Sequence, residues 1–198
     1  MPEEATLPTR NRALIAVTGP KRAGKTTLCA RLVARCVAAG WRVGGVLAPD
    51  RTENGAKVGI DVVWLRDGQR RPLARIVPDG DAATVGEYAF DDAVLAETLA
   101  VLLRDLATPL DLVVIDEIGR LELIQSGGYA PALAAVAETQ ARVVVFTVRE
   151  SYVQALAERL APALLPLCAA AHDGGADAAL DALLAIVRGA NHGTTAGI

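Results

Sequence analysis

Continuous apolar runs alternate along this chain with segments in which apolar residues recur every three or four positions. The runs are typical of strands buried on both faces of a sheet, and the periodic segments are typical of helices with one buried face. The opening strand, helix and strand imply a parallel sheet with a right-handed crossover. The predicted strands cover residues 13–17, 41–47, 112–115, 143–148 and 165–167, and the predicted helices cover residues 28–39, 91–106, 131–140, 151–160 and 176–187.

A different pattern follows the second predicted strand. Apolar residues alternate with polar or small ones over residues 58–64, Asp67-Gly68 is a turn signal, and a further apolar stretch covers residues 73–77. This pattern predicts an antiparallel β-hairpin that is added to the parallel sheet. The expected fold class is therefore α/β, with three layers, a mostly parallel sheet and an added antiparallel hairpin.

Composition favours one compact domain. The chain has 198 residues, of which 52% are hydrophobic and 22% are charged, and its formal net charge is −3. These values exclude a disordered segment, and they argue against a protein that binds nucleic acid or anionic membranes through an excess of positive charge. We expect a single domain over residues 12–189, with flexible tails at residues 1–11 and 190–198.

Several other classes of protein are not indicated. The first residues are acidic and contain proline, and no apolar run of about 18 residues is present, so we expect neither export nor a membrane span. The three cysteines form no CxxC pair, which argues against a disulfide framework or a zinc site. His172 and His192 have no catalytic or metal-ligand spacing. A cytoplasmic protein fits these features best.

One motif points to phosphate chemistry. Residues 19–26 read GPKRAGKT and satisfy the pattern G-x-x-x-x-G-K-[ST], between a predicted strand and a predicted helix. Glycines in such a loop let successive N–H groups point at a phosphate, and the helix presents its positive end to the same anion. The predicted nucleotide-binding residues are Gly19, Pro20, Lys21, Arg22, Ala23, Gly24, Lys25, Thr26 and Thr27.

Two residues of this motif have specific expected roles. Lys25 reaches the β- and γ-phosphates, and the hydroxyl of Thr26 coordinates Mg²⁺. The chain contains only three lysines, Lys21, Lys25 and Lys57, and otherwise uses arginine. A lysine at this position is chemically motivated, because the compact ammonium suits a site among phosphates.

A second candidate site lies at the end of the strand predicted over residues 112–115, which runs directly into Asp116 and Glu117. Asp116, at the carboxyl end of a strand beside the P-loop strand, would hold Mg²⁺. Glu117 would orient and deprotonate an attacking water. Acids at strand ends also cap helices or face solvent, but their combination with a P-loop favours the functional interpretation.

The chain resembles the small P-loop nucleoside-triphosphatases first recognised in thermophiles, whose animal member is called cancer-related nucleoside-triphosphatase. The resemblance rests on TGPKRAGKTTL at residues 18–28, GGVLAPDRTENGAKVGIDVVWL at 44–65 with PLARI after it, VGEY at 85–88 and DEIGRLEL at 116–123. These segments occur in the order that the family has. The last two are more specific than the P-loop.

The resemblance implies Mg²⁺-dependent hydrolysis of ATP, GTP and related triphosphates on a RecA-like sheet. It places Lys25 and Thr26 at the phosphates and the metal, Asp116 at the metal, and Glu117 as the base. Arg120 stands where the family usually has lysine, and it either positions the γ-phosphate or a switch loop or is a surface charge. Arg149, after the strand at 143–148, is a candidate cation for the γ-phosphate or a surface residue at a helix start.

Recognition of the base is less well predicted. The family usually has a Thr, Glu and Arg cluster after the second strand, whereas this chain has Asp50, Arg51 and Thr52, and it lacks an Asn-Arg element near residues 170–178. Seven aromatic residues in all leave Tyr129 and Tyr152 as the leading candidates to stack on a base. Weak discrimination among ATP, GTP, CTP and UTP is therefore expected.

Two other function classes are alternatives to a hydrolase. A P-loop nucleotide or small-molecule kinase would have an arginine-rich lid and an acceptor pocket, and residues 66–75 are the only candidate, although they fit a hairpin better. A GTP-switched adaptor usually has an Asn-Lys-x-Asp element, which is absent from this sequence. A metal-delivery protein has Cys or His ligands, which are scarce here. A hydrolase that is a monomer or a weak homo-oligomer is the expected function.

Overall fold

The computed structural model describes residues 12–77, 86–160, 168–169 and 175–192. Its strands are β1 (Ala13–Gly19), β2 (Val43–Leu47), β3 (Asp50–Glu53), β4 (Ala56–Trp64), β5 (Arg70–Ile76), β6 (Tyr88–Phe90), β7 (Leu112–Ile118), β8 (Val143–Arg149) and β9 (Cys168–Ala169). Its α-helices are α1 (Lys25–Ala38), α2 (Asp92–Leu106), α3 (Arg120–Leu123), α4 (Ala130–Ala135), α5 (Val153–Leu160) and α6 (Gly175–His192). Short 3₁₀ helices cover Val136–Glu138 and Glu150–Tyr152.

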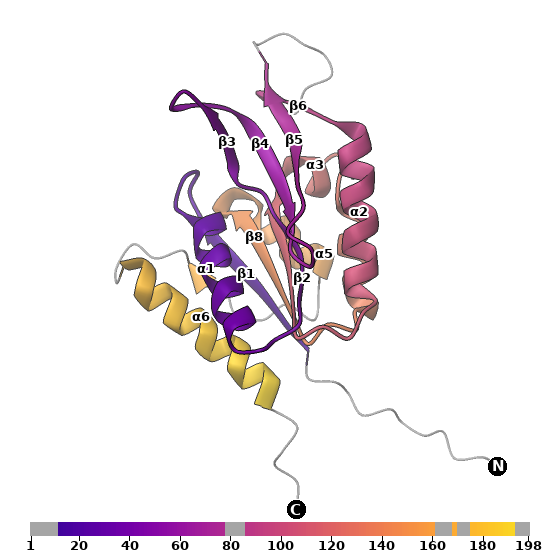
Figure 1. Ribbon diagram of the computed structural model, residues 1–198. Coiled ribbons are helices and arrows are strands. Elements are labelled where there is room, and N and C mark those ends of the chain that lie inside the picture. The colour runs from indigo at the N-terminus through magenta and orange to yellow at the C-terminus, as the bar shows by residue number, and fades with distance from the viewer. Residues whose placement is uncertain (1–11, 78–85, 161–167, 170–174, 193–198) are drawn as a thin grey trace, which may run out of the picture.

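All of these strands form one sheet, in the order β6-β5-β4-β2-β7-β8-β1-β9, with β3 paired to β4 (Figure 1). The part from β2 to β9 is parallel, and β4, β5 and β6 extend it as antiparallel strands. The α/β class with an added hairpin is confirmed. One expectation is wrong: the strand that carries Asp116 does not lie beside the P-loop strand β1, because β8 pairs with both and separates them.

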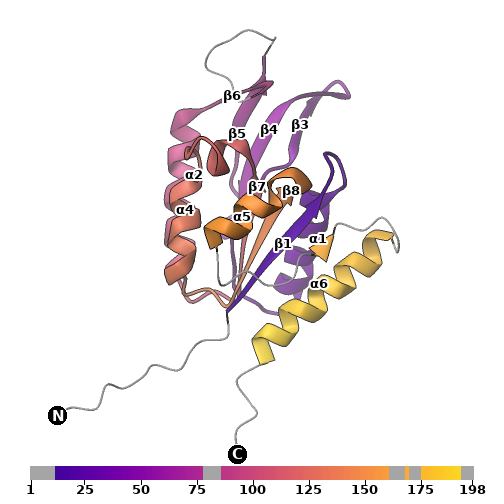
Figure 2. The same cartoon turned by 180° about the vertical axis from the view of Figure 1, so that it is seen from behind.

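Helices cover both faces of the parallel part of the sheet (Figures 1 and 2). Helices α1 and α6 pack on one face, against Ile15 and Val17 of β1, and α2, α4 and α5 pack on the other, against Leu14 and Ala16. Successive side chains of a strand point to opposite faces, so each residue of the β1 run meets one helical layer or the other. This burial on both faces explains the continuous apolar sequence.

Helix α2 begins as its sequence predicts. The carboxylate of Asp91 accepts hydrogen bonds from the backbone N–H groups of Ala93 (3.0 Å) and Val94 (3.1 Å), which is the arrangement of an N-cap. Most of the leucines on its predicted buried face are at least partly buried, but Leu103 is 38% exposed.

Several other strands and helices differ from the predicted ones in their presence or in where they end. Strands β3 and β6 were not predicted, and β3 is polar and mostly exposed, so it has no apolar alternation to reveal it. Helix α4 ends at Ala135 and continues only as a 3₁₀ turn. Helix α6 runs to His192, past the start of the predicted tail. Residues 1–11 and 193–198, the strand predicted at 165–167, and His172 lie outside the described residues. Within the described part of the chain, no helix combines the length and the apolar character needed to cross a membrane.

Candidate active site

The P-loop connects β1 to α1, as its motif predicts. Gly24 has a φ of 78°, a left-handed conformation that suits glycine, and Arg22 shares this region with a φ of 67°. The buried ammonium of Lys25 donates hydrogen bonds to the carbonyl oxygens of Gly19 (3.0 Å) and Pro20 (2.9 Å). Burial lowers the pKa of Lys25, and the nearby Glu117 carboxylate opposes this change.

Asp116 lies at the centre of a buried polar cluster. Its carboxylate is fully buried and accepts hydrogen bonds from the Thr26 hydroxyl (3.3 Å) and the backbone N–H of Ala48 (2.9 Å). The hydroxyl of Thr147, on β8, donates to the same carboxylate. Burial raises the pKa of Asp116, and these hydrogen bonds oppose the rise. The two residues predicted to hold the metal are therefore in direct contact.

Glu117 adopts a backbone conformation that a glutamate rarely takes. Its φ is 64°, and the register between β7 and β8 shifts between Ile115 and Ile118, so the strand is irregular at the two acids. The backbone N–H of Glu117 donates to the Thr147 hydroxyl (2.8 Å). Loss of surrounding water and the neighbouring Asp116 carboxylate raise the pKa of Glu117. Strain of this kind occurs where surrounding contacts over-determine a functional residue.

The two arginines predicted as candidates for the γ-phosphate, Arg120 and Arg149, differ in whether they line the cavity at the P-loop. Arg149 ends β8, is the register partner of Gly19 on β1, and lines the cavity at the P-loop with Lys25 and Glu117. Arg120 begins α3 and lines a different cavity. The turn that carries Arg120 is fixed by Glu122, whose buried carboxylate accepts from the backbone N–H of Gly119 (3.0 Å).

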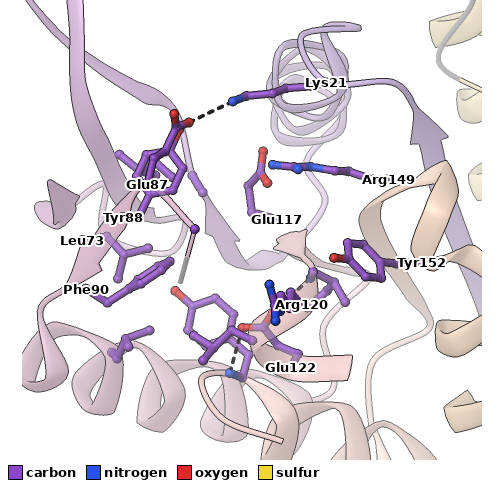
Figure 3. Close-up of a pocket in the computed structure, with 18 residues that line it drawn as sticks. Lys21, Leu73, Glu87, Tyr88, Phe90, Glu117, Arg120, Glu122, Arg149 and Tyr152 are labelled. Carbon is purple, nitrogen blue, oxygen red and sulfur yellow. Dashed lines mark hydrogen bonds and ion pairs between the residues drawn. The ribbon is translucent and has the colours of Figure 1, made fainter. Parts of the chain in front are cut away.

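Two cavities meet at Glu117. The phosphate cavity, of about 310 Å³, is lined by the P-loop and by residues of β4 and β6. The second cavity, of about 370 Å³, lies beyond Glu117, between the added antiparallel strands and the segment after β7. Figure 3 shows the side chains of Glu117 and Arg149 pointing toward one another, and both residues also line the phosphate cavity. Residues common to both cavities are Lys21, Ile60, Tyr88, Glu117 and Arg149.

Lys57, on β4, is a residue of the phosphate cavity that the sequence reasoning missed. Its ammonium lies 2.5 Å from a carboxylate oxygen of Asp50 and 5.3 Å from the centre of the Tyr88 ring. Lys21 also lines this cavity, but its ammonium pairs with Glu87 at 2.8 Å. All three lysines of the chain therefore line the phosphate cavity. The scarcity of lysine was a signal that pointed to Lys57 as well as to the P-loop.

Comparison with known proteins identifies the family of this chain. Residues 14–165 match the model of a family described as "NTPase". The chain belongs to this NTPase family. It is similar to the nucleoside-triphosphatase THEP1 of Ignicoccus hospitalis, with 40% identity over 55% of this chain and 60% of that protein. It is also similar to the protein of the same name from Methanopyrus kandleri, with 31% identity over 69% of this chain and 79% of that protein.

Animal relatives of this NTPase-family chain have a related name. A cancer-related nucleoside-triphosphatase homolog from Bos taurus is 31% identical over 67% of this chain and 73% of its own length. The solution structure of a human cancer-related nucleoside triphosphatase has a TM-score of 0.69 and 25% identity, and the match covers 90% of this chain and 98% of the human one. Several matches to curated relatives, the first among them, span only about three fifths of the relative's length.

The expectation for base stacking is wrong for Tyr129 in this NTPase-family chain. Tyr129 is only 3% exposed, because it packs in the core under α2 and α4, and it lines the second cavity instead of the phosphate cavity. Tyr152 also lines the second cavity. The ring that reaches the phosphate cavity is Tyr88, which was not among the predicted stacking residues.

The arginine-rich tract forms part of the hairpin, as the sequence favoured. Arg66 donates to the buried carboxylate of Asp105 (3.2 Å), and Arg70 donates to Asp61 (2.7 Å). These side chains are engaged with acids of the fold, away from both cavities. The tract therefore does not form an arginine-rich lid over either cavity.

Proposed function

We propose that this chain is a Mg²⁺-dependent nucleoside-triphosphatase that hydrolyses ATP, GTP, CTP and UTP to the diphosphate and phosphate. The observation that carries the proposal is the meeting of Thr26, Asp116 and Glu117 beside the P-loop. A phosphate cradle, a hydroxyl and carboxylate for a cation, and a second carboxylate at the γ-phosphate end together suit phosphoryl transfer to water.

The P-loop and Lys25 bind the triphosphate. Backbone N–H groups of the loop and the start of α1 hold the phosphates. The ammonium of Lys25 donates hydrogen bonds to the carbonyl oxygens of Gly19 and Pro20. A phosphate oxygen is a stronger acceptor for a charged donor, so Lys25 turns from these carbonyls to the β- and γ-phosphates when a nucleotide binds.

The metal site is expected at Thr26 and Asp116. A hydroxyl and a carboxylate are oxygen ligands of the type that Mg²⁺ prefers, and Mg²⁺ usually keeps several waters, so few protein ligands are needed. Within the described residues there is no cluster of three or more His, Cys, Asp or Glu that would form a closed cage. A cation beside the buried Asp116 would offset the cost of keeping its carboxylate charged. When bound, Mg²⁺ neutralises charge on the phosphate oxygens.

Glu117 and Arg149 act at the γ-phosphate. The carboxylate of Glu117 orients an attacking water and accepts its proton. Arg149, whose side chain points toward Glu117 in Figure 3, stabilises charge on the γ-phosphoryl oxygens. Thr147 keeps the Glu117 backbone in its left-handed conformation, so the base is positioned before the nucleotide arrives.

Weak base selectivity follows from the lining of the phosphate cavity. Its lining is rich in charged groups, both on the P-loop and on the strands around it, and Tyr88 is the one aromatic ring that the described residues place there. That ring lies against the ammonium of Lys57. Affinity should therefore come mostly from the phosphates. A preference of about a hundredfold for one nucleotide would contradict this part of the proposal.

The test is phosphate release from each of the four nucleotides, with and without Mg²⁺ and without any added acceptor. We expect Lys25→Ala to lose nucleotide binding, and Glu117→Gln to bind nucleotide but release little phosphate. Glu158→Gln is the matched control, because Glu158 is an exposed glutamate whose carboxylate bonds only with Gln154 among the described groups. Undiminished turnover in Glu117→Gln would reject the assigned base, and activity in Lys25→Ala would reject the assigned phosphate site.

A further inference from the structure

The second cavity is built like a binding site for a small molecule. Figure 3 shows Leu73, Tyr88 and Phe90 on one side, Arg149 and Tyr152 on the other, and Glu117 and Arg120 between them. The remaining apolar lining includes Leu95 of α2, Ile118 and Leu121. Apolar and aromatic walls with a few polar groups are typical of ligand pockets.

The size of this cavity exceeds what hydrolysis requires. A water molecule occupies about 30 Å³ in the liquid, whereas the second cavity measures about 370 Å³. Small-molecule pockets commonly measure about 300–1,000 Å³. A hydrolase that admitted only water to Glu117 would have no use for an apolar space of this size next to its base.

A bound nucleotide does not fill the second cavity. With its phosphates on the P-loop, a triphosphate presents its γ-phosphate toward Glu117 and Arg149, so its base extends away from them. Thr26 and Thr27 line the phosphate cavity but not the second cavity. The second cavity therefore lies beyond the γ-phosphate, where the acceptor of a phosphoryl group has to stand.

The polar groups of the second cavity indicate the class of ligand. The carboxylate of Glu122 is already satisfied by backbone N–H groups, and Glu87 pairs with Lys21. Arg120 has no ion-pair partner among the described residues. The hydroxyl of Tyr129 is buried beside the same cavity. An unpaired cation beside aromatic walls suits an aromatic ring that carries a carboxylate, and a phosphoryl acceptor also needs a hydroxyl group.

We infer that the second cavity binds a phosphoryl acceptor, a small aromatic carboxylate with a hydroxyl group, and that the chain transfers the γ-phosphoryl group to it. The hydroxyl oxygen forms a bond to the γ-phosphorus, and the bond between the γ-phosphorus and the β–γ bridging oxygen breaks. The hydroxyl proton passes to Glu117, and the products are a phosphate monoester, the nucleoside diphosphate and a proton. This inference rests on the proposed function, since it uses the same phosphate cavity and the same base.

Binding is tested first, without nucleotide, on the full chain. The probe is 4-(hydroxymethyl)benzoate, followed by saturation-transfer NMR. Two analogues serve as matched controls: 4-methylbenzoate lacks the hydroxyl, and 4-methylbenzyl alcohol lacks the carboxylate. We expect saturable binding of both carboxylates, and binding of the alcohol that is weaker by about tenfold or more because it has no partner for Arg120. Absence of saturable binding by all three compounds would overturn the inference.

Transfer is then measured with ATP labelled at the γ-phosphate. The readout is the ratio of phosphorylated probe to free phosphate, so a change in overall turnover cancels. Leu95→Trp fills the second cavity, whereas Leu103→Trp makes the same substitution at an exposed position of the same helix. We expect the ratio to fall at least about tenfold in Leu95→Trp and to stay unchanged in Leu103→Trp. Thermal melting of both variants checks that they fold.

The outcomes separate this inference from the proposed function. Phosphate release with no labelled probe, despite saturable probe binding, would overturn the acceptor role and leave the hydrolase intact. Equal ratios in Leu95→Trp and Leu103→Trp, with both variants folded, would also overturn it. Loss of nucleotide binding and hydrolysis in the unaltered chain would reject the proposed function itself. Binding of the probe would remain measurable in that case.

Discussion

Thr147 on β8 holds together the two acids at the end of β7, and its replacement by valine tests this arrangement. The side chain is fully buried. Its hydroxyl donates to the Asp116 carboxylate (2.5 Å) and accepts from the Glu117 backbone N–H (2.8 Å). Valine keeps nearly the same shape but removes both hydrogen bonds, so the change isolates their contribution.

The expected loss can be worked from the partners that remain. A buried group that loses its partner costs about 1–3 kcal/mol. Asp116 keeps hydrogen bonds from Thr26 and Ala48, and the Glu117 N–H keeps a 3.1 Å contact to Asp116. The cost of each lost hydrogen bond therefore falls toward the lower end of this range. Together the two lost bonds should lower the free energy of unfolding by about 2–3 kcal/mol. Loss of a group that orients metal ligands and a base should lower kcat by roughly tenfold to a hundredfold.

Urea denaturation followed by circular dichroism measures the loss in free energy of unfolding. Phosphate release from Mg²⁺-ATP measures the loss in kcat. Thr147→Ser is the control, because serine keeps the hydroxyl and loses one methyl group, at a cost of about 1 kcal/mol in stability. The serine variant should keep most of the activity. Wild-type kcat in Thr147→Val, or an equal loss in both variants, would refute the view that the hydroxyl positions Glu117.

Three further predictions concern the frame of the site. Asp105→Ala should lower the free energy of unfolding by about 3 kcal/mol, because it removes the buried carboxylate that accepts hydrogen bonds from the Gly45 N–H and from Arg66. Urea denaturation measures this loss, and a loss below about 1 kcal/mol would contradict the role of Asp105. Gly45→Ala should give no soluble folded protein, because the added Cβ would lie 2.0 Å from a backbone oxygen. Gly55→Ala is the control and should fold, because the space around Gly55 is open. A soluble Gly45→Ala variant with a native circular dichroism spectrum would contradict this prediction. Burial raises the pKa of Cys36 to about 11, so little thiolate exists at pH 8. Iodoacetamide should therefore alkylate Cys36 only after the chain unfolds, which peptide mass spectrometry can measure. Labelling of Cys36 in the folded protein would contradict this prediction.

Much of the candidate site could be predicted because its signals are local in sequence. The P-loop is one continuous octapeptide, and Asp116 and Glu117 end one apolar run. The hairpin follows from alternation over a few residues and a turn signal. Each of these depends on the spacing of neighbouring residues, which backbone geometry converts into structure without reference to distant segments.

Contacts between distant segments were decided by the tertiary structure. The position of β8 between β1 and β7 brings Thr147 under Asp116, 31 residues away in sequence. The added strands bring Lys57 and Tyr88 to the phosphate cavity, although neither belongs to a recognised motif. Tyr129, predicted to stack on a base, is buried because α2 and α4 cover it.

The sequence alone therefore determined the class of fold, the position of the P-loop and the identity of the two acids. The tertiary structure decided which strand supports those acids, that Lys57 lines the cavity at the P-loop, and that a second cavity opens beyond Glu117. The physical reason is that periodicity and turn chemistry act over a few residues, whereas strand order and cavity lining depend on how buried surfaces pair across the whole chain.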